Sequence, residues 1–141
     1  MDKRIIILSV LAFGCLCCSP DRSTKKAVRQ PLLDAIRMVE SSGDDNPKDG
    51  DGGKAIGPFQ IHEAYWMDAT EYDTSIGGEY EDCRKRAYAE KIVTAYMRRW
   101  VPEDKWTDER IARVHNGGGP GLWKSKAAGE YWKKVQQHLD R

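Results

Sequence analysis

The sequence predicts an α+β fold that is predominantly helical, and two observations support this. Apolar residues recur at steps of three and four, the period of an α-helix, in the segments 31–42, 79–100 and 128–139. The segment 43–57 instead holds five Gly, one Pro and four Asp, which favours a loop or a small β-hairpin. With 40% hydrophobic residues, five Trp and six Tyr, the chain can build a core, and we expect one domain over residues 31–141.

The first helix is expected to run from Pro31 to Ser42. Proline suits the first helical position, because its φ angle is already helical and its missing N–H has no intrahelical partner there. The apolar side chains that fall on one side of this helix are Leu32, Leu33, Ala35, Ile36 and Val39. The loop or hairpin follows, and residues 58–68, which mix aromatic and polar side chains, are expected to include a short helix.

Three further helices are expected in the second half of the chain. The longest covers residues 79–100 and ends before Pro102, which cannot continue a helix. Thr107 can cap the next helix, which ends at a run of glycines. A last helix is expected over residues 128–139.

The N-terminus predicts export. Lys3 and Arg4 precede an apolar run of ten residues, 5–14, which is too short to span a bilayer because a membrane helix needs ~20. We therefore expect a signal peptide over residues 1–18 and a polar linker over residues 19–30. The expected location is the periplasm, the outer membrane as a lipoprotein, or the medium.

The four cysteines divide into two groups. Three lie at the end of the expected signal peptide, at Cys15, Cys17 and Cys18. The sequence "AFGC" resembles a lipoprotein cleavage box, although Ala12 stands where Leu is usual, so a lipid membrane anchor on Cys15 and free secretion both stay open. Cys83 is alone in the mature domain and cannot form an internal disulfide, so we interpret it as a packing residue.

Charge and motif spacing exclude several classes of function. Lys+Arg is 23 and Asp+Glu is 22, and without residues 1–14 the balance is 21 to 21, which argues against nucleic acid as a partner. The three histidines lack metal-site spacing, the Gly/Asp loop lacks EF-hand spacing, and no G-x-S-x-G serine motif occurs. We expect a monomer with no metal and no cofactor.

Glu40 has an unusual place on the first helix. With Leu32 at zero on a helical wheel, Glu40 lies at ~80°, between Ile36 at ~40° and Leu33 at ~100°. Partial desolvation and the last-turn carbonyl groups would both raise the pKa of a carboxyl there, as a general acid requires. The wheel alone leaves open a glutamate at the edge of the apolar face that reaches water.

The loop after this helix offers a second carboxylate. A two-carboxylate glycosidase pairs a protonated acid with an ionised carboxylate in a polar environment, a division for which lysozyme is the type example. The candidates are Asp44, Asp45, Asp49 and Asp51. Each of them could instead be a turn residue that bonds its own backbone, so the residues alone do not choose between them.

Several segments resemble one protein family. "VESSG" at 39–43 and "GPFQI" at 57–61 resemble the lysozyme and lytic-transglycosylase superfamily. "GPFQIHEAYWMDA" at 57–69 is similar to the invertebrate-type lysozymes, also called the destabilase family. Three later segments resemble the closing segments of that family. They are "YMRRW" at 96–100, "ARVHNGGGPG" at 112–121 and "YWKKVQ" at 131–136. Order and spacing agree over residues 33–137.

The resemblance implies a lysozyme-like fold with a small hairpin or loop region at about 43–57. It implies cleavage of the β-1,4 bond between N-acetylmuramic acid and N-acetylglucosamine, with peptidoglycan or a chito-oligosaccharide as substrate. It makes Glu40 the general acid and Asp51 the nucleophile or charge stabiliser, with Asp49 as the alternative. The positions that match the substrate cleft, each of which could instead be structural, are Gln60, Tyr65, His115 and Asn116.

The chain also departs from the family. Animal members are rich in disulfides, whereas this domain has one cysteine, so we expect a bacterial relative held by packing. The serine linked to isopeptidase activity is absent from residues 52–55, and that activity is not expected. Three activities are weighed: a retaining hydrolase, a lytic transglycosylase that uses Glu40 alone, and a non-catalytic peptidoglycan-binding module.

Overall fold

The computed structural model describes residues 25–140, and the expected signal peptide with Cys15 lies outside them. This part of the chain forms five α-helices and one two-stranded antiparallel sheet. The helices are α1 (Gln30–Ser41), α2 (Glu63–Tyr72), α3 (Arg86–Trp100), α4 (Asp108–Gly117) and α5 (Lys126–Leu139), and the strands are β1 (Ala55–Ile56) and β2 (Ile61–His62). The predominantly helical α+β fold is thus confirmed. None of these helices is both long and apolar enough to cross a membrane.

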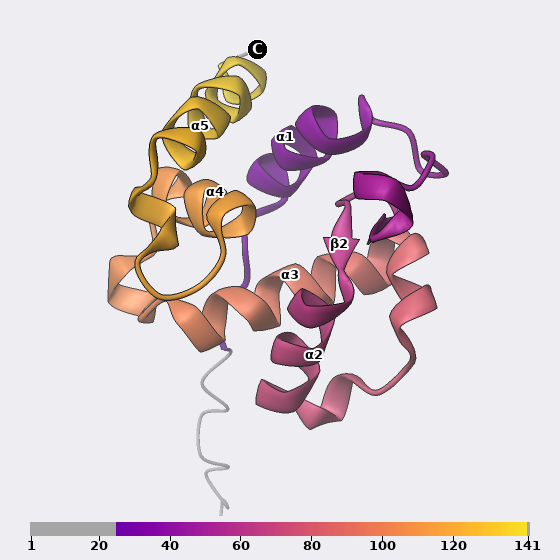
Figure 1. Ribbon diagram of the computed structural model, residues 1–141. Coiled ribbons are helices and arrows are strands. Elements are labelled where there is room, and N and C mark those ends of the chain that lie inside the picture. Colours follow the sequence, from indigo (N-terminus) through magenta and orange to yellow (C-terminus); the bar gives the residue numbers. More distant parts are fainter. Residues whose placement is uncertain (1–24, 141) are drawn as a thin grey trace, which may run out of the picture.

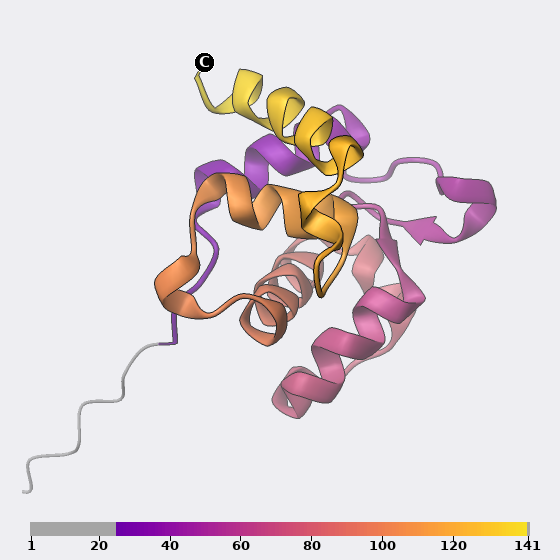
Figure 2. The same cartoon turned by 60° about the vertical axis from the view of Figure 1, so that its left-hand side comes forward.

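The helices form two groups on either side of α3 (Figures 1 and 2). On one side α5 packs against both α1 and α4, and on the other side α2 packs against α3. The small sheet precedes α2 directly, and short 3₁₀ turns connect the larger elements. As a result, the loop that leaves the end of α1 leads across from the first group to the second.

A single core joins the two groups. Its largest fully buried side chains include Leu32 and Ile36 of α1, Phe59 and Ile61 of the hairpin, and Ile92 and Met97 of α3. The expected apolar face of α1 is confirmed, because Leu32, Leu33, Ala35 and Ile36 are all buried. Cys83 is a free, fully buried thiol within this core, as its interpretation as a packing residue requires.

The residues that precede Pro31 already pack against the rest of the domain. Val28 is 5% exposed and belongs to the core, and the Arg98 side chain donates to the backbone carbonyls of Lys25 and Lys26 at 2.9 and 2.8 Å. The described part of the expected linker over residues 19–30 is therefore held against the domain by a buried apolar side chain and by these hydrogen bonds. The helix itself begins at Gln30, with Pro31 in its first turn.

The sheet lies later than the sequence predicted. Ala55 pairs with His62 and Ile56 with Ile61, so β1 falls inside the expected region of 43–57 and β2 beyond it. The helix expected within residues 58–68 correspondingly starts only at Glu63. The residues "GPFQ" form the turn between the strands, because Gly57 and Gln60 both adopt positive φ angles, of 71° and 48°.

The long helix expected over residues 79–100 is divided. A 3₁₀ turn covers Tyr80–Arg84, Lys85 is extended, and α3 begins at Arg86. A reciprocal capping box between Glu79 and Asp82 stabilises the separate turn. A tertiary contact explains the break, because the hairpin turn packs so tightly on it that a Cβ atom on Gly57 would lie 2.1 Å from the Cys83 carbonyl oxygen.

Candidate active site

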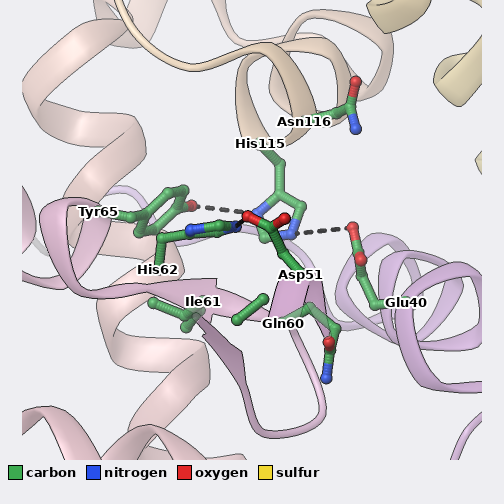
Figure 3. A pocket seen from close by; sticks show the side chains of 9 residues that line it. Glu40, Asp51, Gln60, Ile61, His62, Tyr65, His115 and Asn116 are labelled. Carbon is green, nitrogen blue, oxygen red and sulfur yellow. Dashed lines mark hydrogen bonds and ion pairs between the residues drawn. The ribbon is translucent and has the colours of Figure 1, made fainter. Parts of the chain in front are cut away.

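Six of the seven side chains proposed from the sequence line one cavity of about 310 Å³, and the alternative carboxylate Asp49 does not (Figure 3). The six are Glu40 from α1, Asp51 from the loop, Gln60 from the hairpin turn, Tyr65 from α2, and His115 and Asn116 from α4. The lining is completed by Ala55, Ile61 and His62. The volume lies at the lower end of the ~300–1,000 Å³ range of ligand sites. Segments distant in sequence thus meet at a single concave site.

Glu40 lines the inner wall of this cavity. It lies in the last turn of α1, and its side chain is 19% exposed. The Tyr131 hydroxyl of α5 donates a hydrogen bond of 2.6 Å to its Oε1 atom, and His115 Nε2 of α4 lies 3.5 Å from the same atom. The carboxyl therefore points into the protein, as the helical wheel suggested, and meets polar groups there.

A buried histidine connects Glu40 to the half-buried Tyr65. The His115 side chain is 4% exposed, and its Nδ1 atom lies 3.1 Å from the Tyr65 hydroxyl. Burial raises the pKa of Tyr65 well above its ordinary value, so the hydroxyl stays protonated and can donate a hydrogen bond to Nδ1. In the neutral imidazole the ring proton then lies on Nε2, which faces Glu40.

The two candidate aspartates have different surroundings. Asp51 lines the cavity with a side chain that is 65% exposed, and His62 Nε2 lies 3.7 Å from its Oδ2 atom. Asp49 is not among the residues that line the cavity, and it forms a two-pronged ion pair with Arg84, whose Nη2 lies 3.0 Å from Oδ2. The Arg84 guanidinium lowers the pKa of Asp49. Only Asp51 is therefore available to a ligand in the cavity.

Backbone strain gathers at this site. Among the described residues, the non-glycine positions with positive φ are Ser42 at 55°, Asp51 at 47° and Gln60 at 48°. Two of them line the cavity, and the third follows Glu40 by two positions. Such conformations cost ~1–3 kcal/mol each and cluster at functional sites. The pattern supports a functional cavity independently of the side chains.

Gln60 and Asn116 also line the cavity, but they are less buried than His115. The Gln60 amide donates to the Gly57 carbonyl at 2.9 Å and the Lys48 carbonyl at 3.4 Å, so its nitrogen ties the loop to the hairpin turn. Asn116 is exposed in the last turn of α4, and its side chain points away from the other cavity side chains (Figure 3). Gln60 therefore shapes the cavity wall, while Asn116 is free to contact a ligand at the edge.

Sequence reasoning missed two residues of the site. One of them is His62, which lies in strand β2. Its position directly after the "GPFQI" segment could have indicated that it lines the cavity. Tyr131 fitted the apolar stripe of the last helix, and no local signal marks its hydroxyl as the partner of Glu40, 91 residues away. Within residues 25–140, no group of three or more His, Cys, Asp and Glu side chains is arranged to hold a metal ion.

The comparison with protein families decides the relationship. Residues 30–138 match the family described as Destabilase. The chain belongs to the destabilase family. These are the invertebrate-type lysozymes, and the matched residues include every side chain that lines the cavity. The resemblance seen in the sequence is thus confirmed.

Mollusc lysozymes are similar to this chain in sequence. Lysozyme 1 of Crassostrea virginica is 34% identical over 129 residues, which cover 85% of this chain and 67% of that protein. The lysozyme of Meretrix lusoria is 35% identical over 92 residues, covering 61% of this chain and 69% of that protein. The similarity therefore extends over most of the described domain.

Solved structures of lysozymes agree with this chain in fold. The complex of Aeromonas hydrophila PliI with Meretrix lusoria lysozyme matches with a TM-score of 0.65 and 30% identity, over 81% of this chain and 93% of that chain. The Tapes japonica lysozyme matches with a TM-score of 0.64 and 29% identity, over 79% and 94%. The fold is therefore that of the invertebrate-type lysozymes.

Proposed function

We propose that this protein is a lysozyme that hydrolyses the β-1,4 bond between N-acetylmuramic acid and N-acetylglucosamine in peptidoglycan. The observation that carries the proposal is the pairing of two unlike carboxyl groups in one cavity. Glu40 is mostly enclosed and accepts a hydrogen bond from Tyr131, while Asp51 is open to solvent beside His62. An enclosed acid and a solvated carboxylate are the two groups that glycoside hydrolysis needs.

The proposed mechanism has two steps and retains the anomeric configuration. In the first, the Glu40 carboxyl gives its proton to the leaving glycosidic oxygen while an Asp51 oxygen bonds the anomeric carbon and the C–O bond breaks. In the second, the Glu40 carboxylate takes a proton from water, whose oxygen displaces Asp51 from the anomeric carbon. Both residues return to their starting protonation states.

Two other activities make different chemical demands. A lytic transglycosylase would use Glu40 alone, since the 6-hydroxyl of the muramic acid attacks its own anomeric carbon. The position of Asp51 in the cavity favours hydrolysis over this reaction, because the transglycosylase has no need of a second carboxylate there. A binding module without turnover would need neither group in a reactive position.

The products of peptidoglycan digestion separate these activities. Hydrolysis yields reducing ends, the transglycosylase yields 1,6-anhydro ends, and a binding module yields no soluble fragments, all of which mass spectrometry distinguishes. We expect reducing ends, and we expect Glu40→Gln to slow their release by ~10²–10⁴-fold, the usual contribution of a positioned acid. Full activity in Glu40→Gln would refute the mechanism.

Export completes the proposal. Peptidoglycan lies outside the cytoplasmic membrane, and the N-terminal charged and apolar residues 3–14 fit a signal peptide. Cell fractionation of the wild type and of Cys15→Ser would test both fates of the chain. Release of the variant alone into the soluble fraction supports a lipid anchor, and release of both supports free secretion.

A further inference from the structure

Both protein partners of the Glu40 carboxyl face the same oxygen. The Tyr131 hydroxyl lies 2.6 Å from Oε1, and His115 Nε2 lies 3.5 Å from Oε1. Among the described residues, the one side-chain hydrogen bond to this carboxyl is accepted by Oε1, and none is accepted by Oε2. The two oxygens of this carboxyl are therefore unequal before any substrate arrives.

Tyr131 is a constant donor to Oε1. The residue is 7% exposed, and its pKa is raised well above the ordinary value by burial and by the nearby charge of Glu40. The hydroxyl therefore stays protonated, and the distance to Oε1 makes the carboxyl its acceptor. A proton placed on Oε1 would compete with the Tyr131 proton for the same space.

His115 presents a second N–H group to the same atom. In the tautomer whose Nδ1 accepts a hydrogen bond from the Tyr65 hydroxyl, the ring proton of the neutral imidazole is on Nε2, which faces Oε1. The ring is held in this orientation by its surroundings, since Tyr65, Phe59 and Tyr131 all lie against it with centroid distances of 5.5, 6.5 and 6.3 Å. At 3.5 Å the contact with Oε1 is weaker than that of Tyr131.

We propose that Tyr131 and His115 are positioning residues that keep Oε1 of Glu40 as the acceptor and leave Oε2 to carry the transferable proton. This inference rests on the proposed function of Glu40. When Oε2 gives its proton to the glycosidic oxygen, the new carboxylate already has donors at Oε1, so its charge is stabilised without rearrangement. In the second step Oε2 recovers a proton from water, and Oε1 again keeps its partners.

Tyr131→Phe tests this assignment in the full chain, because it keeps the ring in the core and removes only the donor. We expect kcat for peptidoglycan to fall by ~10–100-fold, the effect of one hydrogen bond to a charged group, and KM to change by less than about twofold. The matched control is Tyr88→Phe, which removes a hydroxyl that donates to the Gly77 carbonyl at 2.6 Å, away from the cavity. The control should keep the wild-type kcat.

Infrared spectroscopy supplies a readout that does not depend on turnover. The carbonyl band of protonated Glu40 is isolated by subtracting the spectrum of Glu40→Gln at acid pH, and in this form Oε1 is the carbonyl oxygen. Loss of the Tyr131 hydrogen bond should move this band to higher frequency, while Tyr88→Phe should leave it in place. An unmoved band together with an unchanged kcat in Tyr131→Phe would overturn the proposal.

Two outcomes keep this test separate from that of the proposed function. If the wild type releases no reducing ends, the hydrolase proposal fails, but the infrared band still reports which oxygen accepts the hydrogen bond.

If Tyr131→Phe does not fold, His115→Phe removes the second donor and keeps a flat ring. It should lower kcat and shift the same band by less than Tyr131→Phe would, because its contact is longer. No effect on either would overturn the proposal.

Discussion

At the scale of single residues, Asp49 and Asp51 show how two neighbouring carboxylates acquire different roles. Asp51 lines the cavity, whereas Asp49 is engaged by Arg84. We predict that Asp51→Asn lowers the rate of reducing-end release by ~10²–10³-fold, as expected for a group that stabilises transition-state charge. Asp49→Asn, its matched control in the same loop, should keep the activity within about threefold, because its charge is not presented to the ligand. The reverse order of effects would make Asp49 the second carboxylate.

The Asp49–Arg84 pair has its own pH signature. Because Arg84 lowers the pKa of Asp49 below its ordinary value of 3.8, the pair contributes stability above that pH and loses it as the pH falls further. The wild type should therefore have a higher melting temperature than Asp49→Asn at about pH 6, with a difference that shrinks toward about pH 2. Thermal unfolding of both proteins across this range measures the difference. A difference that persists at the lowest pH would contradict the ion pair.

The residues of the site differ in how far they could be predicted. Glu40 was singled out by its place on the apolar arc, which depends only on the local helical period, and by the family resemblance, which also chose Asp51 among the four aspartates of the adjoining loop. The role of Tyr131 depends on how α5 packs against α1, which no local pattern encodes. His115 was found by resemblance, while its link to Tyr65 appears only in three dimensions.

At the scale of elements, the turn between β1 and β2 determines where the cavity wall lies. Gly57 has a φ of 71°, and its Cα faces the Cys83 carbonyl so closely that an added Cβ atom would lie 2.1 Å from that oxygen. Gly52 has a φ of 64°, but an added Cβ atom there meets no atom within 4 Å. The two glycines thus share one conformational demand and differ in packing.

We predict that Gly52→Ala lowers the free energy of unfolding by ~1–2 kcal/mol, the cost of a left-handed non-glycine residue. Gly57→Ala should cost more than ~3 kcal/mol, because the strain is joined by a clash with backbone that cannot move aside. Urea denaturation of the two variants gives both values. Equal losses would mean that the hairpin turn does not pack on the Tyr80–Arg84 segment as described.

The helix boundaries differ in whether the local sequence predicts them. Thr107 caps α4 through a hydrogen bond to the Arg110 N–H, as local chemistry indicated. The expected helix over residues 79–100 was wrong at its start, because the approach of Gly57 requires a break that the local sequence does not announce. Local caps are thus readable from sequence, whereas a helix divided by a distant turn is not.

At the scale of the whole molecule, the fold depends on its core rather than on crosslinks. The described residues hold one cysteine, Cys83, and it is free and fully buried, whereas the core draws side chains from α1, the hairpin, α3, α4 and α5. A contiguous core of this kind unfolds as a unit in a domain of this size. The melting temperature should therefore be the same with and without a reducing agent.

The Cys83 thiol consequently serves as a probe of global unfolding. Burial raises its pKa to about 12, so the native protein holds it as an unreactive thiol, and only the thiolate attacks labelling reagents. In a protein with Cys15, Cys17 and Cys18 changed to Ser, we predict negligible labelling at about pH 8 in buffer and complete labelling in denaturant. Because the folded state disfavours the Cys83 thiolate, the free energy of unfolding should also decline as the pH rises from 9 toward about 12. Labelling that follows the same denaturation curve as circular dichroism would confirm one cooperative core, and labelling before that transition would show that the Tyr80–Arg84 segment opens separately.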